Sequence, residues 1–239
     1  MPSIQLVIFD MAGTTVADEH EVEACFAEAA TQTGLTVSAE RVLAMQGMSK
    51  RTVFDILWRD QLAHPTADTT RYVEKSYQQF TEILEEHYRT QSVNPTEGCL
   101  ETFAFLHEQG IRIALTTGFY RKVTDIILGR LGWLEGLNEH YLGTTETTIQ
   151  ASIASDEVEQ GRPQPFMIQE VMRRLGVTDL RAVVNIGDTP VDLQSARAAG
   201  VGHNLGLTNG THFRAQLTPH PHHQLLNSLL ELPEYIRSA

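Results

Sequence analysis

The sequence predicts an α/β fold: a Rossmann-like, doubly wound parallel sheet as the core, with an inserted helical cap domain. Three observations support this prediction. Short apolar runs end in polar, turn-prone residues, helical patterns that end at glycine alternate with them, and the alternation stops over one long helical stretch. Strands that alternate with helices in this way form parallel sheets through right-handed crossovers.

Three apolar runs have the character of strands that are covered on both faces. They are residues 4–9 before Asp10, residues 111–115 before Thr116-Thr117-Gly118, and residues 182–186 before Gly187-Asp188. Ligands of parallel sheets bind beyond the carboxyl ends of the strands. We therefore expect Asp10, Thr117 and Asp188 to be neighbours in space.

Four core helices are predicted by patterns that stop at a glycine, the residue that favours the left-handed position after a helix. These patterns are residues 99–109, 122–131, 165–175 and 191–199. The stretch without strands contains further amphipathic patterns at residues 21–33, 39–45, 52–62 and 70–88. We predict a Rossmann-like core formed by residues 1–15 and 94–239, and a helical cap domain formed by residues 16–93.

Composition narrows the class of protein. The 239 residues include 41% hydrophobic residues, enough for a substantial core. The formal charge of -12 disfavours nucleic acid or an anionic membrane as the partner. Cys25 and Cys99 lack metal-site spacing, so we expect two buried thiols. With no basic leader region and no run of about 18 apolar residues, we expect a cytoplasmic protein.

Asp10 follows the first predicted strand and precedes a turn that contains Gly13, Thr14 and Thr15. Such a turn can direct backbone N–H groups towards a phosphate beside the carboxylate. Asp10 is therefore a candidate covalent nucleophile. The alternative is that Asp10 caps a turn in which the threonines have ordinary turn roles.

Asp188 and Asp192 lie four residues apart at a predicted strand-to-helix junction, so both can face the same edge of the sheet. Together with Asp10 they form an oxygen-rich site suited to Mg²⁺, which keeps several waters and takes few carboxylates. For Asp192, capping of the helix is the alternative role.

Three carboxylates and an anionic substrate would repel one another, so the site needs fixed positive charge besides the metal. Arg162, which lies between Gly161 and Pro163 just before a predicted helix, is the candidate. Thr117 can donate a hydroxyl hydrogen bond to a phosphoryl oxygen. Its alternative role is to cap the helix that follows.

Four groups of residues, in this order along the chain, resemble the four motifs of the haloacid dehalogenase (HAD) superfamily. They are Asp10-Met11-Ala12-Gly13-Thr14-Thr15, Thr117-Gly118, Arg162, and Gly187-Asp188 with Asp192. Within the superfamily, Asp-x-Ala-Gly-Thr-Thr, Thr-Thr-Gly, Gly-Arg-Pro and Gly-Asp-Thr resemble the phosphonoacetaldehyde hydrolase (phosphonatase) branch. The match spans the whole predicted core.

The resemblance implies a hydrolase in which Asp10 attacks phosphorus and forms an aspartyl-phosphate. It implies that Mg²⁺ is held by Asp10, by the backbone carbonyl of Ala12 and by Asp188, with Asp192 orienting the metal shell. Thr117 and Arg162 would be catalytic groups that position the phosphoryl oxygens, and Gly118, Arg162 and Lys50 would contact the substrate.

Ala12 departs from the phosphatases of the superfamily, which usually have a second aspartate there as general acid and base. The phosphonatase branch is thought to use a cap lysine instead, which forms a Schiff base with the aldehyde so that the carbon departs as an enamine. Lys50 falls at the matching spacing, and lysine suits the role because burial can lower its pKa.

Two further departures affect the role of Lys50. Where this branch is expected to have a histidine and a tyrosine, the chain has Val53 and Phe119, which cannot assist imine formation or proton transfer. Three roles for Lys50 therefore stay open: a Schiff base, a cationic clamp for phosphate, or a surface lysine.

We predict a Mg²⁺-dependent hydrolase for phosphonoacetaldehyde or a related small phosphonate, with cap closure that excludes water. The first alternative is a phosphatase for small phosphate monoesters, in which Lys50 only binds substrate. An alternative of another class is a phospho-acceptor signalling domain, against which the long cap and Arg162 argue. The amphipathic cap helices predict internal packing, and a homodimer through the cap is a further expectation.

Overall fold

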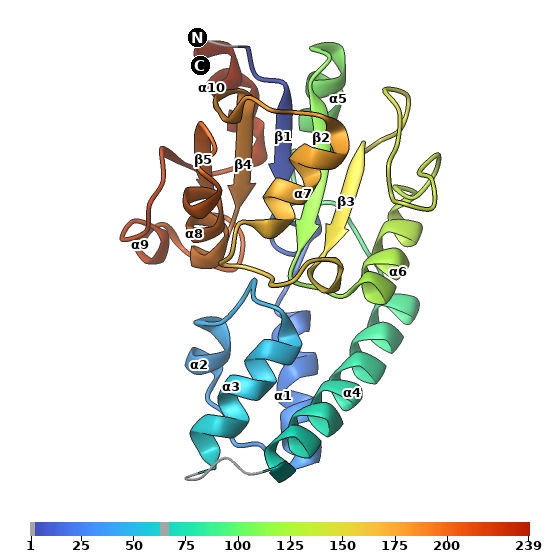
Figure 1. The fold of residues 1–239 in the computed structure, drawn as a ribbon, viewed down its shortest axis with the longest axis vertical. Coiled ribbons are helices and arrows are strands. Elements are labelled where there is room, and N and C mark those ends of the chain that lie inside the picture. Colours follow the sequence, from blue (N-terminus) through green and yellow to red (C-terminus); the bar gives the residue numbers. More distant parts are fainter. Residues whose placement is uncertain (1–2, 63–66) are drawn as a thin grey trace.

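The computed structural model describes residues 3–62 and 67–239 of the protein (Figure 1). Within these residues, six strands form one parallel sheet in the order β3-β2-β1-β4-β5-β6. The strands are β1 (Leu6–Phe9), β2 (Arg112–Thr117), β3 (Ala151–Ala154), β4 (Val183–Gly187), β5 (His203–Leu207) and β6 (Gln224–Leu226). This is the strand order of a doubly wound Rossmann-type sheet, so the predicted fold class is confirmed.

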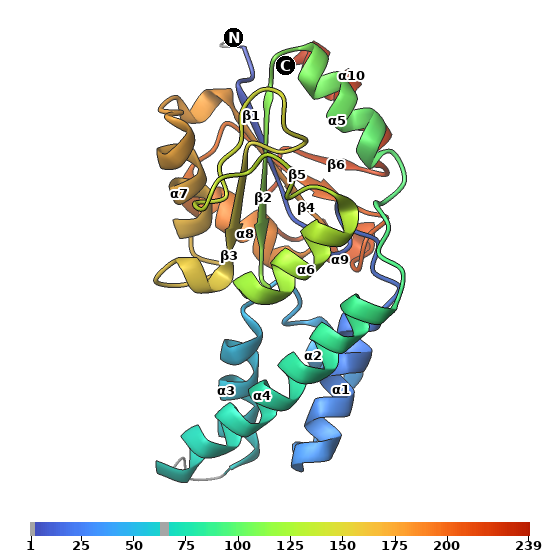
Figure 2. The same cartoon turned by 90° about the vertical axis from the view of Figure 1, so that its right-hand side faces the viewer.

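Helices cover both faces of the sheet because side chains alternate along each strand (Figure 2). Val7 and Phe9 face α5 (Cys99–Glu108), α6 (Arg121–Leu131) and α10 (Leu232–Ser238). Leu6 and Ile8 face α7 (Phe166–Leu175) and α8 (Pro190–Ala199). The short helix α9 (Arg214–Leu217) follows β5. The core is thus split into two apolar layers by a sheet that is itself buried.

The remaining helices form a separate layer beyond the carboxyl ends of the strands (Figure 1). They are α1 (Glu21–Thr33), α2 (Ala39–Leu43), α3 (Lys50–Gln61) and α4 (Ala67–Thr90). Phe26 of α1 stacks on Phe54 of α3 with 4.2 Å between ring centroids, and Phe80 of α4 contacts both rings. The amphipathic faces of these helices therefore pack against one another, and we call α1–α4 the cap.

Two chain segments connect the cap to the core side by side. The N–H of Ala17 donates to the carbonyl of Asn94 at 2.9 Å, and the N–H of Thr96 donates to the carbonyl of Thr15 at 3.1 Å. This pairing supports our proposal that the cap spans residues 16–93 and the core residues 1–15 and 94–239. Residues 1–2 and 63–66 of those ranges lie outside the described residues.

The predicted helices and strands match observed ones to within three residues at each end. The glycines after the four core helices, Gly110, Gly132, Gly176 and Gly200, all have positive φ. The prediction did not include β3, β5, β6, α9 or α10. Cys25 and Cys99 are buried free thiols, as expected. In the described part of the chain, no helix has the length and apolar character needed to cross a membrane.

Candidate active site

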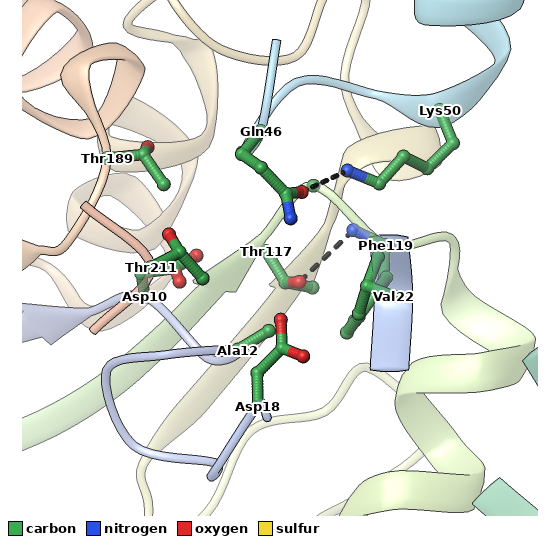
Figure 3. A pocket seen from close by; sticks show the side chains of 12 residues that line it. Asp10, Ala12, Asp18, Val22, Gln46, Lys50, Thr117, Phe119, Thr189 and Thr211 are labelled. Carbon is green, nitrogen blue, oxygen red and sulfur yellow. Dashed lines mark hydrogen bonds between the residues drawn. The ribbon is translucent and has the colours of Figure 1, made fainter. Parts of the chain in front are cut away.

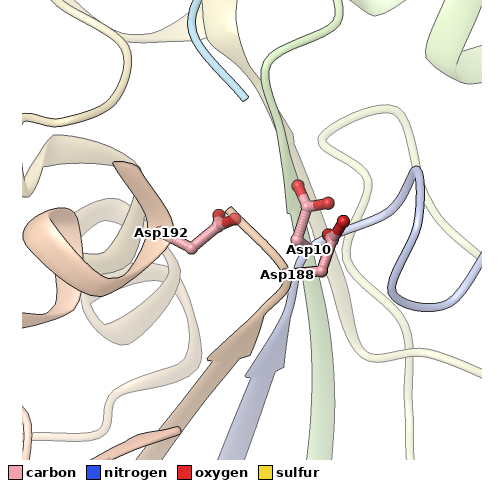
Figure 4. A group of neighbouring side chains, drawn as sticks. All are labelled: Asp10, Asp188 and Asp192. Atoms are coloured by element: carbon pink, nitrogen blue, oxygen red, sulfur yellow. The ribbon is translucent and has the colours of Figure 1, made fainter. Parts of the chain in front are cut away.

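Three carboxylates meet at the carboxyl edge of the sheet (Figure 4). Asp10 directly follows β1, Asp188 follows β4, and Asp192 lies in the first turn of α8. One oxygen from each residue lies within 4.8 Å of the others, and all three residues are buried. The structure therefore brings together the three acidic residues that the sequence predicted to be neighbours.

The pairing of β1 with strands on both sides determines this meeting. Phe9, the last residue of β1, lies opposite Leu115 of β2 and Ile186 of β4. All three strands run in the same direction, so they end at the same edge. Thr117, the last residue of β2, reaches this edge together with Asp10 and Asp188.

Asp188 is fixed by hydrogen bonds to both of its carboxylate oxygens. Thr14 Oγ1 donates to Oδ1 at 2.8 Å, and the N–H and Oγ1 of Thr211 both donate to Oδ2 at 2.7 Å. Burial and the charge of Asp192 raise the pKa of Asp188 to about 6, although the bonds from Thr211 and Thr14 act to lower it. Asp188 is therefore held in one orientation.

Arg162 lies between Asp10 and Asp192 and is only 5% exposed. Its Nη1 donates to Asp10 Oδ1, its Nε lies 2.9 Å from Asp192 Oδ1, and its Nη2 donates to Thr116 Oγ1 at 2.6 Å. Burial acts to lower the pKa of Arg162, but Asp192 and Asp10 outweigh it and raise the pKa. The predicted cation is thus in the site and stays charged.

Asp192 caps the following helix, the alternative role that the sequence left open, and it also faces the other charged groups of the site. Its Oδ2 accepts hydrogen bonds from the N–H and Oγ1 of Thr189, which forms a capping box at the start of α8. Its Oδ1 faces Arg162 as an ion pair, and that oxygen has no aligned hydrogen bond from the described residues. Asp192 therefore connects the start of α8 to Arg162.

The charge of the cluster fits a divalent cation. Three buried carboxylates face one guanidinium, and uncompensated buried charge is costly. Burial raises the pKa of Asp10 well above its ordinary value; Arg162 lowers it, and Asp192 and Asp188 raise it further. Oxygen donors of this kind suit Mg²⁺, which would restore the charge balance and keep the carboxylates ionised.

Lys50 lies in a cavity between the cap and the core (Figure 3). It is the first residue of α3, is 7% exposed, and its Nζ donates to Gln46 Oε1 at 3.0 Å. Burial lowers the pKa of Lys50 to about 8, although Asp18, Asp10 and Glu23 act to raise it. The surface role for Lys50 is therefore wrong, while the imine and clamp roles stay open.

The same cavity contains Asp10, Ala12, Thr117 and Gly118 in its wall, so it joins Lys50 to the candidate nucleophile. Its volume is about 30 Å³, room for little more than a few water molecules. In the described conformation the cavity is therefore too small for a ligand of more than a few atoms.

Gly118 allows the cap to approach the core this closely. A Cβ atom at Gly118 would lie 2.6 Å from the carbonyl oxygen of Gly47 and 2.9 Å from that of Met48, both in the cap loop before α3. Next to it, Thr117 Oγ1 accepts from the N–H of Phe119 at 3.1 Å. Among the described residues the Thr117 hydroxyl has no acceptor, so it can donate into the cavity (Figure 3).

The positions that departed from the branch pattern supply no acid or base. Ala12 and Phe119 line the cavity, and Val53 packs in the hydrophobic core of the cap. A carboxyl that the sequence analysis did not consider, Asp18, also lines the cavity.

Four contributors to the site were missed: Thr14 as a donor to Asp188, Thr211, Gln46 and Asp18. Thr211 follows β5, whose sequence His-Asn-Leu-Gly-Leu contains no β-branched residue and was not predicted as a strand. Recognition of the turn at Thr208-Asn209-Gly210 after this apolar segment could have placed Thr211 at the same edge.

Comparison with known proteins identifies the family. Residues 4–200 match the haloacid dehalogenase-like hydrolase family. The chain belongs to this family. Two relatives, the phosphonoacetaldehyde hydrolases of Bacillus cereus and Bacillus thuringiensis, are each 30% identical over 213 residues, which cover 83% of this chain and 74% of the relative. The resemblance to the phosphonatase-like branch is thereby confirmed.

Solved structures of the family share the fold. A phosphonoacetaldehyde hydrolase-like protein from Oleispira antarctica has a TM-score of 0.80 and 18% identity, with 98% of this chain and 92% of that chain covered. A hydrolase from Pseudomonas syringae has a TM-score of 0.76 and 19% identity, with 98% of both chains covered. As a member of a hydrolase family, the chain is an enzyme, and the signalling-domain alternative loses its basis.

Replacement of Gly13 tests how the acidic cluster is held. Gly13 has φ +84°, and a Cβ there would collide with the carboxyl group of Asp188. Gly13→Ala should therefore displace Asp188 and weaken Mg²⁺ binding by about 10- to 100-fold, as loss of a metal-supporting contact does. Isothermal titration calorimetry of Mg²⁺ measures this change.

Gly34 provides the matched control for this change. It has nearly the same φ, +83°, but no atom lies within 4 Å of an added Cβ. Gly34→Ala carries a similar backbone strain of about 1 kcal/mol and should leave Mg²⁺ affinity unchanged. Equal losses of affinity in the two variants would show that strain alone, and not contact with Asp188, explains the effect.

Proposed function

We propose that the protein is a Mg²⁺-dependent hydrolase that cleaves the carbon–phosphorus bond of phosphonoacetaldehyde or a related small phosphonate. The observation that carries the proposal is the buried Lys50 amine in the same cavity as Asp10. One cavity then contains a nucleophile for phosphorus and an amine for a carbonyl carbon. The names of the 30%-identical relatives support the same substrate.

The acidic cluster serves the phosphorus end of this substrate. Asp10, the backbone carbonyl of Ala12 and Asp188 would hold Mg²⁺, and Asp192 would orient the metal shell. When bound, the ion supplies positive charge that stabilises the oxygens of the transferring phosphoryl group. The tight contacts of Asp188 with Thr14 and Thr211 keep this ligand in place before substrate arrives.

Asp10 performs the displacement at phosphorus. One of its oxygens forms the bond to phosphorus while the bond from phosphorus to carbon breaks, which leaves an aspartyl-phosphate that water then hydrolyses. Arg162, already paired with Asp10, and the free hydroxyl hydrogen of Thr117 are placed to bind phosphoryl oxygens. The close contact of Gly118 with the cap loop excludes bulk water.

Lys50 makes the carbon able to depart. Its neutral amine condenses with the aldehyde to a protonated imine, so the electron pair of the breaking bond enters an enamine instead of a carbanion. This route needs no acid at position 12, which explains why Ala12 is compatible with activity. The lowered pKa of Lys50, about 8, makes the neutral amine available near neutral pH.

A phosphatase for small phosphate monoesters is the second candidate. It is favoured by the absence of helper side chains at Val53 and Phe119. The hydrogen bond from Lys50 Nζ to Gln46 fits a charged clamp and a neutral amine equally well.

The proposed homodimer and cytoplasmic location stay predictions.

Phosphate release from phosphonoacetaldehyde tests the proposed function directly. We expect purified protein to release phosphate in the presence of Mg²⁺ and to lose this activity when a chelator removes the metal, because the carboxylate cluster then lacks its counter-charge. Colorimetric phosphate determination and detection of acetaldehyde measure the two products. A folded, Mg²⁺-loaded protein that releases neither product would refute carbon–phosphorus cleavage.

Reductive trapping tests the role of Lys50. Borohydride added with phosphonoacetaldehyde should reduce an imine and fix the aldehyde carbon on Lys50, which intact-mass and peptide mass spectrometry detect. The chain has three lysines, and the other two, Lys75 and Lys122, are exposed. We expect Lys50→Arg to abolish trapping and turnover and Lys75→Arg to change neither. Turnover that survives in Lys50→Arg would assign the residue a clamp role.

Introduction of an acid at position 12 separates the two candidate functions. If the protein is a phosphatase, Ala12→Asp should raise hydrolysis of a poor alkyl phosphate ester by about 10²-fold or more, since a positioned acid–base group contributes that much. Under the imine mechanism it should give little gain with phosphonoacetaldehyde. Steady-state kinetics on both substrates measure this, with Ala12→Asn as the neutral control of similar size.

A further inference from the structure

Asp18 is a half-buried residue that lines the active-site cavity and that the proposed cycle does not use. It lies in the segment between the Asp10 turn and α1, and its side chain is directed towards Ala12 and Thr117 (Figure 3). Its Oδ1 is buried and accepts no hydrogen bond from an N–H or hydroxyl group of the described residues. In the described part of the chain, Asp10 and Asp18 are the only carboxyl groups in the cavity wall.

Glu21, in the first turn of α1, is the partner that defines the state of Asp18. Its Oε2 is also buried and also lacks a donor among the described residues. Two carboxyl oxygens can hydrogen-bond to each other only when one of them carries a proton. The pair therefore binds one proton, which satisfies both oxygens.

The proton of this pair belongs to Asp18. Burial and the hydrogen bond with Glu21 raise the pKa of Asp18 to about 7, although the N–H of Val22 acts to lower it. Burial acts to raise the pKa of Glu21 as well, but the hydrogen bond from Asp18 outweighs it and lowers that pKa. Asp18 thus carries the proton, and the Glu21 carboxylate accepts the hydrogen bond from it.

Titratable groups surround the pair on several elements. Lys50 of α3 interacts more strongly with Asp18 than with any other acidic group, and the charge of Asp188 in the core also acts on Asp18. Cys25 of α1 and Tyr88 of α4 both have pKa values raised by burial first and then by acidic neighbours that include Asp18. His87 of α4 acts on Glu21.

We propose that Asp18 is the proton-transfer residue of the imine chemistry at Lys50. It gives its proton to the substrate oxygen that departs when the imine forms, and it takes a proton back when the product imine is hydrolysed. The inference rests on the proposed function, and it assigns to Asp18 the acid–base work that Ala12, Val53 and Phe119 cannot perform.

Protons and bonds balance in imine formation and in hydrolysis of the product imine. The Lys50 nitrogen bonds to the aldehyde carbon, and a proton moves from nitrogen to oxygen. The carbon–oxygen bond then breaks, the nitrogen lone pair forms the carbon–nitrogen double bond, and the proton of Asp18 leaves with the oxygen as water. After carbon–phosphorus cleavage, the enamine carbon takes a proton from solvent, which gives the product imine. Water then adds to this imine, the Asp18 carboxylate accepts the proton that the water loses, and the carbon–nitrogen bond breaks to free acetaldehyde and the Lys50 amine. Hydrolysis of the aspartyl-phosphate returns one proton to solvent.

The test compares pH profiles of kcat/KM for phosphonoacetaldehyde in Asp18→Asn and in the wild type. An asparagine amide can still donate a hydrogen bond to Glu21, so the local structure is retained, but it cannot transfer a proton. We expect a loss of about 10²-fold or more at pH 6, where wild-type Asp18 is protonated. Above pH 8 the loss should shrink, because wild-type Asp18 has itself lost the proton.

Glu21→Gln should move the profile to lower pH. Without the carboxylate partner, the pKa of Asp18 falls, so this variant should begin to lose activity at a lower pH than the wild type does, and it should match the wild type above pH 8, where Asp18 lacks the proton in both. Glu19→Gln removes a neighbouring exposed carboxylate and serves as the matched control with an unchanged profile. A loss in Asp18→Asn that is the same at every pH indicates a structural role and overturns the proposal.

A second comparison separates failure of this inference from failure of the proposed function. If the wild type releases phosphate only from esters, the same variants are assayed with phenyl phosphate and p-nitrophenyl phosphate. A proton donor matters more for the poorer leaving group, so Asp18→Asn should lose more activity with phenyl phosphate. That result would leave Asp18 as the proton-transfer residue, with hydrolysis of phosphate esters as the reaction in place of imine chemistry. Equal losses with both esters, or no turnover of any of these substrates, overturn it.

Discussion

The compensation of buried negative charge by Arg162 is the constraint on which the site depends. Asp10 and Asp192 come from different elements, and both are buried where a lone carboxylate would be strongly disfavoured. The Arg162 guanidinium contacts both and also bonds to Thr116 at the end of β2. One side chain thereby links the loop before α7 with β1, β2 and α8.

The three acidic residues differ in their hydrogen-bond partners. Asp188 has all its hydrogen bonds from Thr14 and Thr211, and Asp192 is bound to Thr189, whereas Asp10 has only Arg162 as a polar side-chain partner among the described residues. The proposed nucleophile is therefore the acidic residue least restrained by neutral donors.

The parts of the fold that the sequence predicted are those with strong local signals. The runs that became β1, β2 and β4 are rich in aliphatic residues, and the core helices stop at glycine, so short-range chemistry suffices to locate them. The strand β3, with the sequence Ala-Ser-Ile-Ala, forms because β2 offers unpaired backbone groups beside it. Such a strand depends on tertiary context, which a local pattern does not contain.

Dependence on tertiary context also distinguishes the site residues that the sequence predicted from those that it missed. Asp10, Thr117 and Asp188 follow strong strands, so topology alone placed them together. Asp18 follows no element with a recognisable signal, and only the tertiary structure shows that its side chain lines the cavity. Departures from a family pattern, such as Val53 and Phe119, likewise show which side chains are absent. They do not show which other residue could take over the role of those side chains.

The paired segments between cap and core have a mechanical consequence. Thr96 Oγ1 bonds to the carbonyl of Thr14, and Thr15 Oγ1 bonds to the carbonyl of Asp10, so the hinge strands and the nucleophile turn form one connected unit. A rotation of the cap about these segments would therefore act on Thr14 and on its hydrogen bond to Asp188. Opening of the cap and loosening of the acidic cluster would then be one movement, so the cluster would be fully assembled only while the cap is closed.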